Sequence, residues 1–354
     1  MKQKTKKKNK TSFWKFAAVF AAIVVLTLIN NLVRKKVVVL QVPGNPGVSG
    51  LETVDDNLIC VFQDGRIVTW NWDSNTQKAD FKVTSDRAVL LNSQRIAAVN
   101  TSGKKMLTVY QLPSGQKQKD FSVGWEDQEV WLRISPDKNS VVLIRRNSPD
   151  STGNVLYEFL AVNIEKEFLG TPTTFSIPQD QAQFIDYAVD NDSRLIAVGS
   201  QKDSGHIAAV DLRNGSLLWN IGYPDTKEFC SVMTSPDNTT LYAGNRDGIL
   251  YKLDIQTGVI IQKIILLEPG EKRPITNDYS VLNLAFSPDG QYYVATINPK
   301  AYILKSETDN MIHIFSPANK LVSKIAFSPD NKFVATSDIR AGYPVKIWPL
   351  PEEN

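Results

Sequence analysis

Histidine and cysteine are scarce in this chain of 354 residues, which contains two of each. His206 and His313 are too few to build a histidine-rich metal site, and no Cys-x-x-Cys pair is present to bind zinc. We expect Cys60 and Cys230 to be two small buried side chains rather than a disulfide. The composition therefore predicts no metal ligands.

The sequence also lacks the short motifs that mark catalytic and cofactor sites. It contains no Gly-x-x-x-x-Gly-Lys phosphate loop, no His-Glu-x-x-His and no Gly-x-Ser-x-Gly. Asp190 and Asp192 are spaced like part of a calcium loop, but the glycine and the distal glutamate of such a loop are missing, which favours a hairpin turn. We therefore expect a protein that is not an enzyme and that has no catalytic, cofactor-binding or metal-binding residues.

Acidic residues are absent from the first 36 residues, which carry ten of the 40 lysines and arginines. Residues 37–354 therefore hold 30 basic against 37 acidic residues, a net charge of −7. Because binding to nucleic-acid phosphates needs clustered Lys and Arg, the acidic body argues against nucleic acid as the main partner.

A single long uncharged run lies near the N-terminus, after a Lys-rich tail at 1–12. Residues 16–29 are too few to span a membrane, which takes about 20, but 13–33 suffice with Trp14 and Lys15 at one interface. A cleaved signal peptide is the alternative, although no small-x-small cleavage site follows the run. We favour an uncleaved single-pass anchor. Seven positive charges precede the run and three follow it, so we expect a cytoplasmic tail and an extracytoplasmic body.

The rest of the chain repeats a pair of short apolar runs around a tight turn. The clearest turns are Ser287-Pro288-Asp289-Gly290 and Ser328-Pro329-Asp330-Asn331. Pro presets φ, Asp can bond its own backbone and Gly accepts a positive φ, so each copy predicts a β-hairpin. Weaker copies begin at Ser135 and Ser235, with a degenerate copy at 189–192 between them. A repeat of about 40–50 residues with several short strands is typical of a propeller blade.

These repeats resemble the WD-repeat β-propeller family. Further residues that carry the resemblance are the strand ends Trp72-Asp73, Val210-Asp211 and Leu253-Asp254, the turns at 114–115, 214–215 and 257–258, and Trp348 at the family's Trp position. The resemblance covers about residues 37–350, but the family's Gly-His pair between blades is absent. It implies an all-β, seven-bladed propeller, or six or eight blades if a long insertion is misread.

The blades are expected at about 48–83, 84–123, 125–178, 180–224, 226–267, 280–322 and 323–350. The last blade shows three evident strands, and the β-branched segment 37–42 is expected to pair with it and close the ring. Trp70 and Trp72 alternate onto one face, which favours a place in the core.

Long connections at 145–154, 268–280, 298–310 and 338–344 are predicted to share one face of the propeller. Exposed Arg and Tyr often carry interface energy. We therefore predict partner contacts at Arg145, Arg146, Arg273, Tyr302, Arg340 and Tyr343, with solvated loops as the alternative. Polar residues of the innermost strands would line the central channel: Arg133, Asp186, Asn283 and Lys324.

The sequence thus predicts a membrane-anchored propeller that acts as a protein–protein interaction platform or as an accessory subunit of a membrane complex. The alternative is a propeller enzyme or small-molecule binder that uses the central channel, which convergent charged groups and a deep apolar pocket there would favour. A third hypothesis is a secreted protein whose N-terminus is removed.

Overall fold

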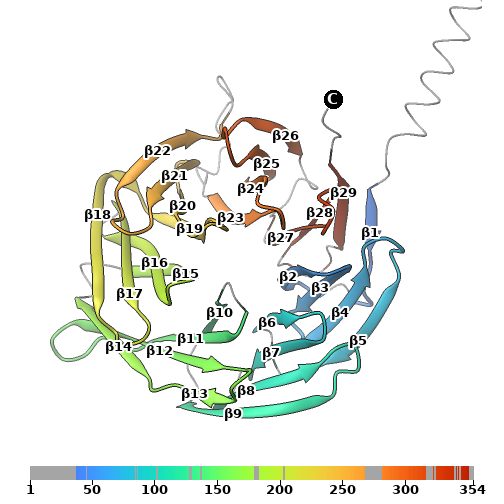
Figure 1. Cartoon of the computed structure of the whole chain (residues 1–354), viewed down its shortest axis with the longest axis horizontal. Coiled ribbons are helices and arrows are strands. Elements are labelled where there is room, and N and C mark those ends of the chain that lie inside the picture. Colours follow the sequence, from blue (N-terminus) through green and yellow to red (C-terminus); the bar gives the residue numbers. More distant parts are fainter. Residues whose placement is uncertain are drawn as a thin grey trace, which may run out of the picture. The chain divides into compact units, whose positions relative to one another are not determined.

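The computed structural model describes residues 37–350 except 45, 84, 86, 101–102, 127–129, 136–137, 179–182, 202–203, 268–280, 316–321, 323, 339, 341 and 343. Within this part of the chain, seven antiparallel sheets follow one another around a ring (Figure 1). The all-β, seven-bladed propeller is therefore confirmed, and each blade begins close to its expected limit, although the last strand of blade 6 ends at Phe315 rather than near 322.

Blades 1–6 each contain four strands in sequence order from the centre outward, called a to d, and blade 3 has one more. Blades 1 to 3 are formed by β2 (Val48–Val54), β3 (Asn57–Phe62), β4 (Arg66–Asn71) and β5 (Gln77–Lys82); β6 (Arg87–Asn92), β7 (Arg95–Val99), β8 (Lys104–Gln111) and β9 (Lys117–Glu126); and β10 (Val130–Ile134), β11 (Ser140–Arg146), β12 (Asn154–Asn163), β13 (Phe168–Leu169) and β14 (Thr173–Pro178). Blades 4 to 6 are formed by β15 (Gln183–Val189), β16 (Arg194–Gln201), β17 (Ser204–Asp211) and β18 (Leu217–Lys227); β19 (Phe229–Thr234), β20 (Thr240–Asn245), β21 (Ile249–Asp254) and β22 (Ile260–Ile265); and β23 (Val281–Phe286), β24 (Tyr292–Ile297), β25 (Lys300–Lys305) and β26 (Met311–Phe315).

Blade 7 contains both ends of the described chain. Its sheet has the order β1 (Val38–Leu40), β29 (Val345–Pro349), β28 (Phe333–Ser337) and β27 (Lys324–Phe327). The outermost strand therefore comes from the N-terminal side and the other three from the C-terminal side. Because β1 supplies the strand that the last repeat lacks, the ring closes without a three-stranded blade.

The Ser-Pro-Asp turns show why these sequences form hairpins. The Ser287 hydroxyl accepts a hydrogen bond from the amide of Tyr292 (2.9 Å) and donates to Asp289 (2.7 Å), whose carboxylate also accepts the amide of Gln291 (3.0 Å). Gly290 has a φ of 71° and closes the turn. Side-chain oxygens thus satisfy backbone amides that no strand partner reaches, which makes the motif a local structural signal.

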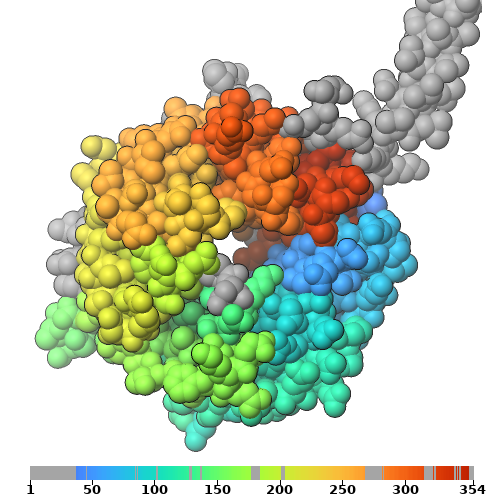
Figure 2. All heavy atoms as spheres, viewed as in Figure 1, coloured from blue at the N-terminus to red at the C-terminus, as the bar shows by residue number. Residues whose placement is uncertain are grey.

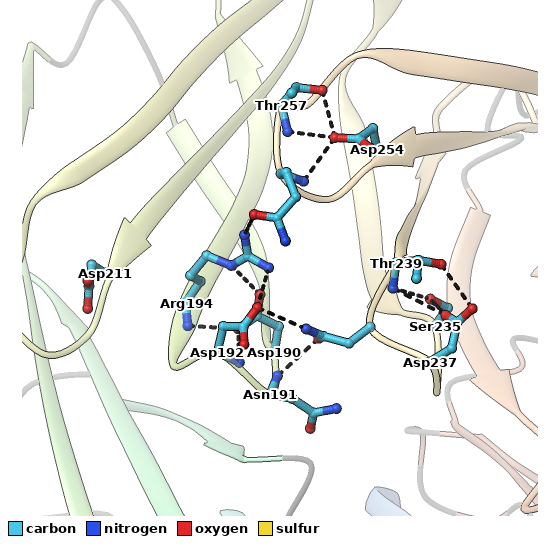
Figure 3. A network of polar contacts seen from close by, with 12 residues as sticks. Asp190, Asn191, Asp192, Arg194, Asp211, Ser235, Asp237, Thr239, Asp254 and Thr257 are labelled. Atoms are coloured by element: carbon cyan, nitrogen blue, oxygen red, sulfur yellow. Dashed lines mark hydrogen bonds and ion pairs between the residues drawn. The ribbon is translucent and has the colours of Figure 1, made fainter.

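The degenerate copy in blade 4 uses a carboxylate in place of the serine (Figure 3). Asp190 accepts the amides of Asp192 (2.9 Å) and Arg194 (2.8 Å), and the Arg194 guanidinium binds the carboxylates of both aspartates. Arg194 also donates to Gln256 of blade 5 (2.5 Å). The aspartates that are spaced like a calcium loop are therefore partners of an arginine in a turn that joins two blades.

The hydrophobic core lies between the faces of neighbouring blades rather than in one central cluster. Between blades 4 and 5, Phe229 contacts Tyr223 and Tyr251 edge-on, at centroid distances of 5.5 and 5.4 Å. Trp70 and Trp72 are 4% and 5% exposed, in agreement with their predicted place in the core. Each blade is thus held by apolar packing on both faces.

Two of the predicted long connections are shorter than expected. Strand β11 continues through Arg145 and Arg146, and strand β25 occupies 300–305 in the middle of the expected loop 298–310. β-Branched and aromatic neighbours favour strand there over a loop. The segment 268–280 lies outside the described residues.

The predicted tail 1–12 and membrane helix 13–33 also lie outside the described residues. Among the residues that are described, the structure contains no helix with the length and apolar character needed to cross a membrane.

Ring closure predicts that one side chain of β1 matters to the whole propeller. Leu40 is 5% exposed, whereas Val39 on the same strand is 44% exposed. Leu40→Ala should lower the free energy of unfolding by about 2–5 kcal/mol, because it removes packing between the two chain ends. Val39→Ala, the matched control, should change it by about 0.5 kcal/mol or less. Urea unfolding of both variants measures this, and equal stabilities would show that β1 does not hold the ring.

Candidate functional site

The centre of the propeller is an opening surrounded by the seven innermost strands, which are β2, β6, β10, β15, β19, β23 and β27 (Figures 1 and 2). We call these strands the inner ring. Their side chains carry most of the polar groups that the sequence places at the channel.

Side chains of the inner ring bond the backbone of the next blade. The bonds run from Arg87 Nη1 to the carbonyl of Val130 (2.5 Å), from Ser231 Oγ to the carbonyl of Val281 (2.6 Å), from Asn283 Nδ2 to the carbonyl of Val322 (2.8 Å), and from the amide of Val232 to Asp186 Oδ2 (3.0 Å). All of them link a blade to its successor in the sequence. They satisfy backbone groups that face the channel and fix the spacing of the blades.

Arg133 and Asp186 form an ion pair across the boundary between blades 3 and 4. Arg133 Nε also donates to the carbonyl of Tyr187 (2.5 Å), and the other oxygen of Asp186 accepts from blade 5. Both side chains are partly exposed, at 31% and 24%. The structure therefore brings these two predicted channel residues together, and their first role is to join blades 3, 4 and 5.

Glu52 on β2 and Lys324 on β27 face the same opening. Burial raises the pKa of Glu52. A smaller opposite effect comes from the Lys138 ammonium, the Leu90 amide and the Lys324 ammonium, which lower this pKa. Burial and the Arg133 guanidinium lower the pKa of Lys324, whereas the carboxylates of Asp186 and Glu52 raise it by a smaller amount. Water reaches part of both side chains, but surrounding protein makes both charged forms costly.

The predicted partner-binding residues that the structure describes belong to three different blades or their connections. Arg145 binds Glu158 and lies 4.7 Å from the ring of Trp125, and Arg340 donates twice to Asp338, at 2.6 and 2.9 Å. These arginines belong to blade 3 and to the connection after β28. Their nearest contacts are within the chain.

The expectation of an exposed Tyr302 is wrong. Tyr302 lies in β25 and is 1% exposed, because the alternation of that strand turns it into the core between blades 5 and 6. Arg146 is half-buried in β11, and Arg273 and Tyr343 lie outside the described residues.

Sequence reasoning missed an apolar surface on the outer strand of blade 5. Ile261 and Ile265 on β22 are 61% and 70% exposed, and Val259 just before this strand is 60% exposed. The signal was present in residues 260–265, where four isoleucines do not alternate with polar residues as one buried face requires.

The outer strands of blades 1 and 2 differ from β22. Strand β5 carries Lys78 and Lys82, and β9 carries Lys117 and Lys119, all on an edge of the sheet. Lysine on an edge strand discourages pairing with another chain. On β22 the corresponding role falls to Lys263 alone, between exposed isoleucines.

A pocket of about 660 Å³ opens between blades 3 and 4, beside the break between β13 and β14. Its charged lining residues are Asp190, which binds Arg194, and Arg213, which binds Asp211 through two bonds. Among the described lining residues, each charged side chain is therefore paired with a charge of opposite sign.

The raised pKa of Glu52 makes stability depend on pH. In the unfolded chain Glu52 loses its proton near pH 4.5, whereas in the folded chain it keeps the proton to a higher pH. Between these two pKa values the free energy of unfolding therefore falls as the pH rises. Glu52→Gln cannot ionise at this position. The free energy of unfolding of the variant minus that of the wild type should therefore increase between about pH 4 and pH 7. Urea unfolding across this range measures the difference.

The control is Glu126→Gln, at an exposed position at the end of β9. It shows what the exchange of a carboxylate for an amide does at the surface, and the profile of Glu52→Gln is compared with it. Parallel pH profiles for Glu52→Gln and the wild type would contradict the effect of burial on Glu52.

Comparisons with known proteins support the fold and leave the function open. No protein-family model and no curated protein matches the sequence. Among solved structures, the crystal structure of the computationally designed Ika8 protein matches with a TM-score of 0.58 at 14% identity, over 86% of this chain and 97% of that one. At that identity the similarity shows a shared fold alone. The seven blades are shown by the sheets of this chain, and its relation to WD-repeat proteins is a resemblance.

Proposed function

We propose that this protein is a non-enzymatic interaction platform that binds a partner protein along the outer edge of blade 5. The propeller fold is compatible with such a role. The observation that carries the proposal is the exposure of Ile261 and Ile265 on an edge strand. Exposed apolar side chains on a free strand edge mark places where another chain binds.

The apolar surface extends toward the neighbouring blade. Leu217 and Leu218 at the start of β18 are each 45% exposed. The turn before β22 packs against that strand, since a side chain at Gly258 would collide with Ile221. Two adjacent outer strands therefore each expose apolar side chains at the rim of the propeller.

The partner that fits this rim is an extended segment with apolar side chains. The outer side of β22 has no strand beside it within the described chain, so its backbone groups on that side can pair with an added strand. Backbone pairing supplies affinity, and contact with Ile261 and Ile265 supplies selectivity for apolar residues.

We further propose that residues 13–33 anchor the propeller as a single-pass membrane protein, with the tail 1–12 in the cytoplasm and the propeller outside it. The uncharged run and the excess of positive charge before it support this orientation. An anchored platform would then serve as an accessory subunit of a membrane complex.

We also propose that the blades are divergent WD repeats. In blade 7 the indole of Trp348 donates to the hydroxyl of Thr336 (2.9 Å), which is the Ser/Thr–Trp part of the network in that family. The histidine part is missing from this sequence.

The interaction proposal predicts that charge on the rim of blade 5 abolishes binding. The variant Ile261→Lys/Ile265→Lys should lose the proteins that co-purify with the wild type from detergent-solubilised membranes, because two ammonium groups prevent strand pairing and apolar contact. Quantitative mass spectrometry of the captured proteins measures the loss, which we expect to be about tenfold or more.

The matched control is Gln118→Lys/Ser122→Lys, which adds the same charge to exposed positions on β9 of blade 2. It should capture the same proteins as the wild type. Equal capture by both double variants would refute the rim of blade 5 as the binding surface. A change from dimer to monomer in Ile261→Lys/Ile265→Lys alone would identify a second copy of this chain as the partner.

The anchor proposal predicts different membrane behaviour for the full chain and for residues 37–354. The full chain should stay in the membrane pellet after an alkaline carbonate wash, and the shortened chain should be released, because only the full chain contains the uncharged run. Protease added outside intact cells should digest the propeller. Release of the full chain by carbonate would overturn the anchor.

A further inference from the structure

Lys324 is the exception in the inner ring. It stands four residues before the turn serine of its blade, the position that Ser231 and Asn283 occupy in blades 5 and 6. Those two side chains bond the backbone of the following blade. No hydrogen bond or ion pair engages the Lys324 ammonium within the residues that the structure describes, although the next blade begins beside it.

Among the described residues, cations outnumber carboxylates around Lys324. Three cations, Lys324, Arg133 and Lys138, and two carboxylates, Glu52 and Asp186, act on one another across the opening. Asp186 is committed to Arg133 and to a backbone amide. Among the described residues that act on Lys324, Glu52 is therefore left to balance the two ammonium groups of Lys324 and Lys138.

The surroundings strengthen this charge. The walls of the opening are strands packed by apolar cores, and such walls focus the field of charged groups into the space between them. Lys138 is exposed at the turn between β10 and β11, so positive potential extends to one mouth of the channel. An anion that enters there meets Lys138 first and Lys324 further in along β27.

We propose that the central channel binds a small oxyanion at Lys324, with Arg133 and Lys138 contributing positive potential. A carboxylate or a phosphate supplies acceptor oxygens for the N–H groups of the Lys324 ammonium, and its negative charge pairs with that ammonium. The Glu52 carboxylate attracts the same ammonium and competes with the ligand, so it lowers the affinity for the anion. This site is separate from the outer rim of blade 5.

Isothermal titration calorimetry of the full chain in detergent at low salt tests the proposal, with inorganic phosphate in one arm and succinate in the other. The wild type should bind one anion per chain in at least one arm. Lys324→Met should weaken this binding by about tenfold or more, because the contacting charge is lost. Glu52→Gln should tighten it, because the competing carboxylate is lost.

Lys332→Met is the matched control: it removes a lysine of the same blade that is 62% exposed and binds Asp330 outside the channel. It should bind like the wild type. Binding of phosphate alone, of succinate alone or of both supports the site and identifies the oxyanion. The proposal is overturned if the wild type binds neither anion, or if Lys324→Met and Lys332→Met bind alike.

Two further measurements keep the test decisive. Circular dichroism shows whether Lys324→Met folds; if it does not, Glu52→Gln decides, and an unchanged or lower affinity overturns the proposal. The variant Ile261→Lys/Ile265→Lys should retain the anion affinity of the wild type, which separates this site from the protein-binding rim.

Discussion

The pairing of β1 with β29 is the contact on which the rest of the propeller depends. Each blade buries its apolar faces against two neighbours, so a gap between the first and last blades would expose two faces at once. By placing an N-terminal strand in the C-terminal sheet, the chain holds its two ends together. The distance between neighbouring blades is then fixed, so that side chains of the inner ring can bond the backbone of the next blade.

The two ends of a blade serve different physical needs. At the centre, polar side chains meet backbone groups of the next blade, and among the described residues Lys324 lies among the charges of Arg133, Asp186 and Glu52. At the rim of blade 5, isoleucines face solvent on an edge that has little protection by charge. The first arrangement is the basis of the proposed anion site and the second that of the proposed protein-binding edge, which are independent proposals on one scaffold.

Several conspicuous arginines stabilise the fold. Arg194 neutralises two aspartates in a turn, Arg133 joins three blades, and Arg145 binds Glu158 beside Trp125. A guanidinium can satisfy several acceptors at once, which makes it effective at boundaries between sheets. The proposed protein-binding surface is therefore the apolar edge of blade 5 rather than these arginines.

The sequence by itself determined the class of fold and the hairpin turns, and it favoured seven blades over six or eight, because these features depend on strand periodicity, serine and aspartate bonds to nearby amides, and the spacing of repeats. Only the tertiary structure decided what each polar or apolar side chain meets. Tyr302 is buried because its strand turns it toward blade 5, and Ile265 is exposed because no strand follows β22. The charge environment of Lys324 depends on groups from other strands, which lie far from it in the sequence and close to it in the ring.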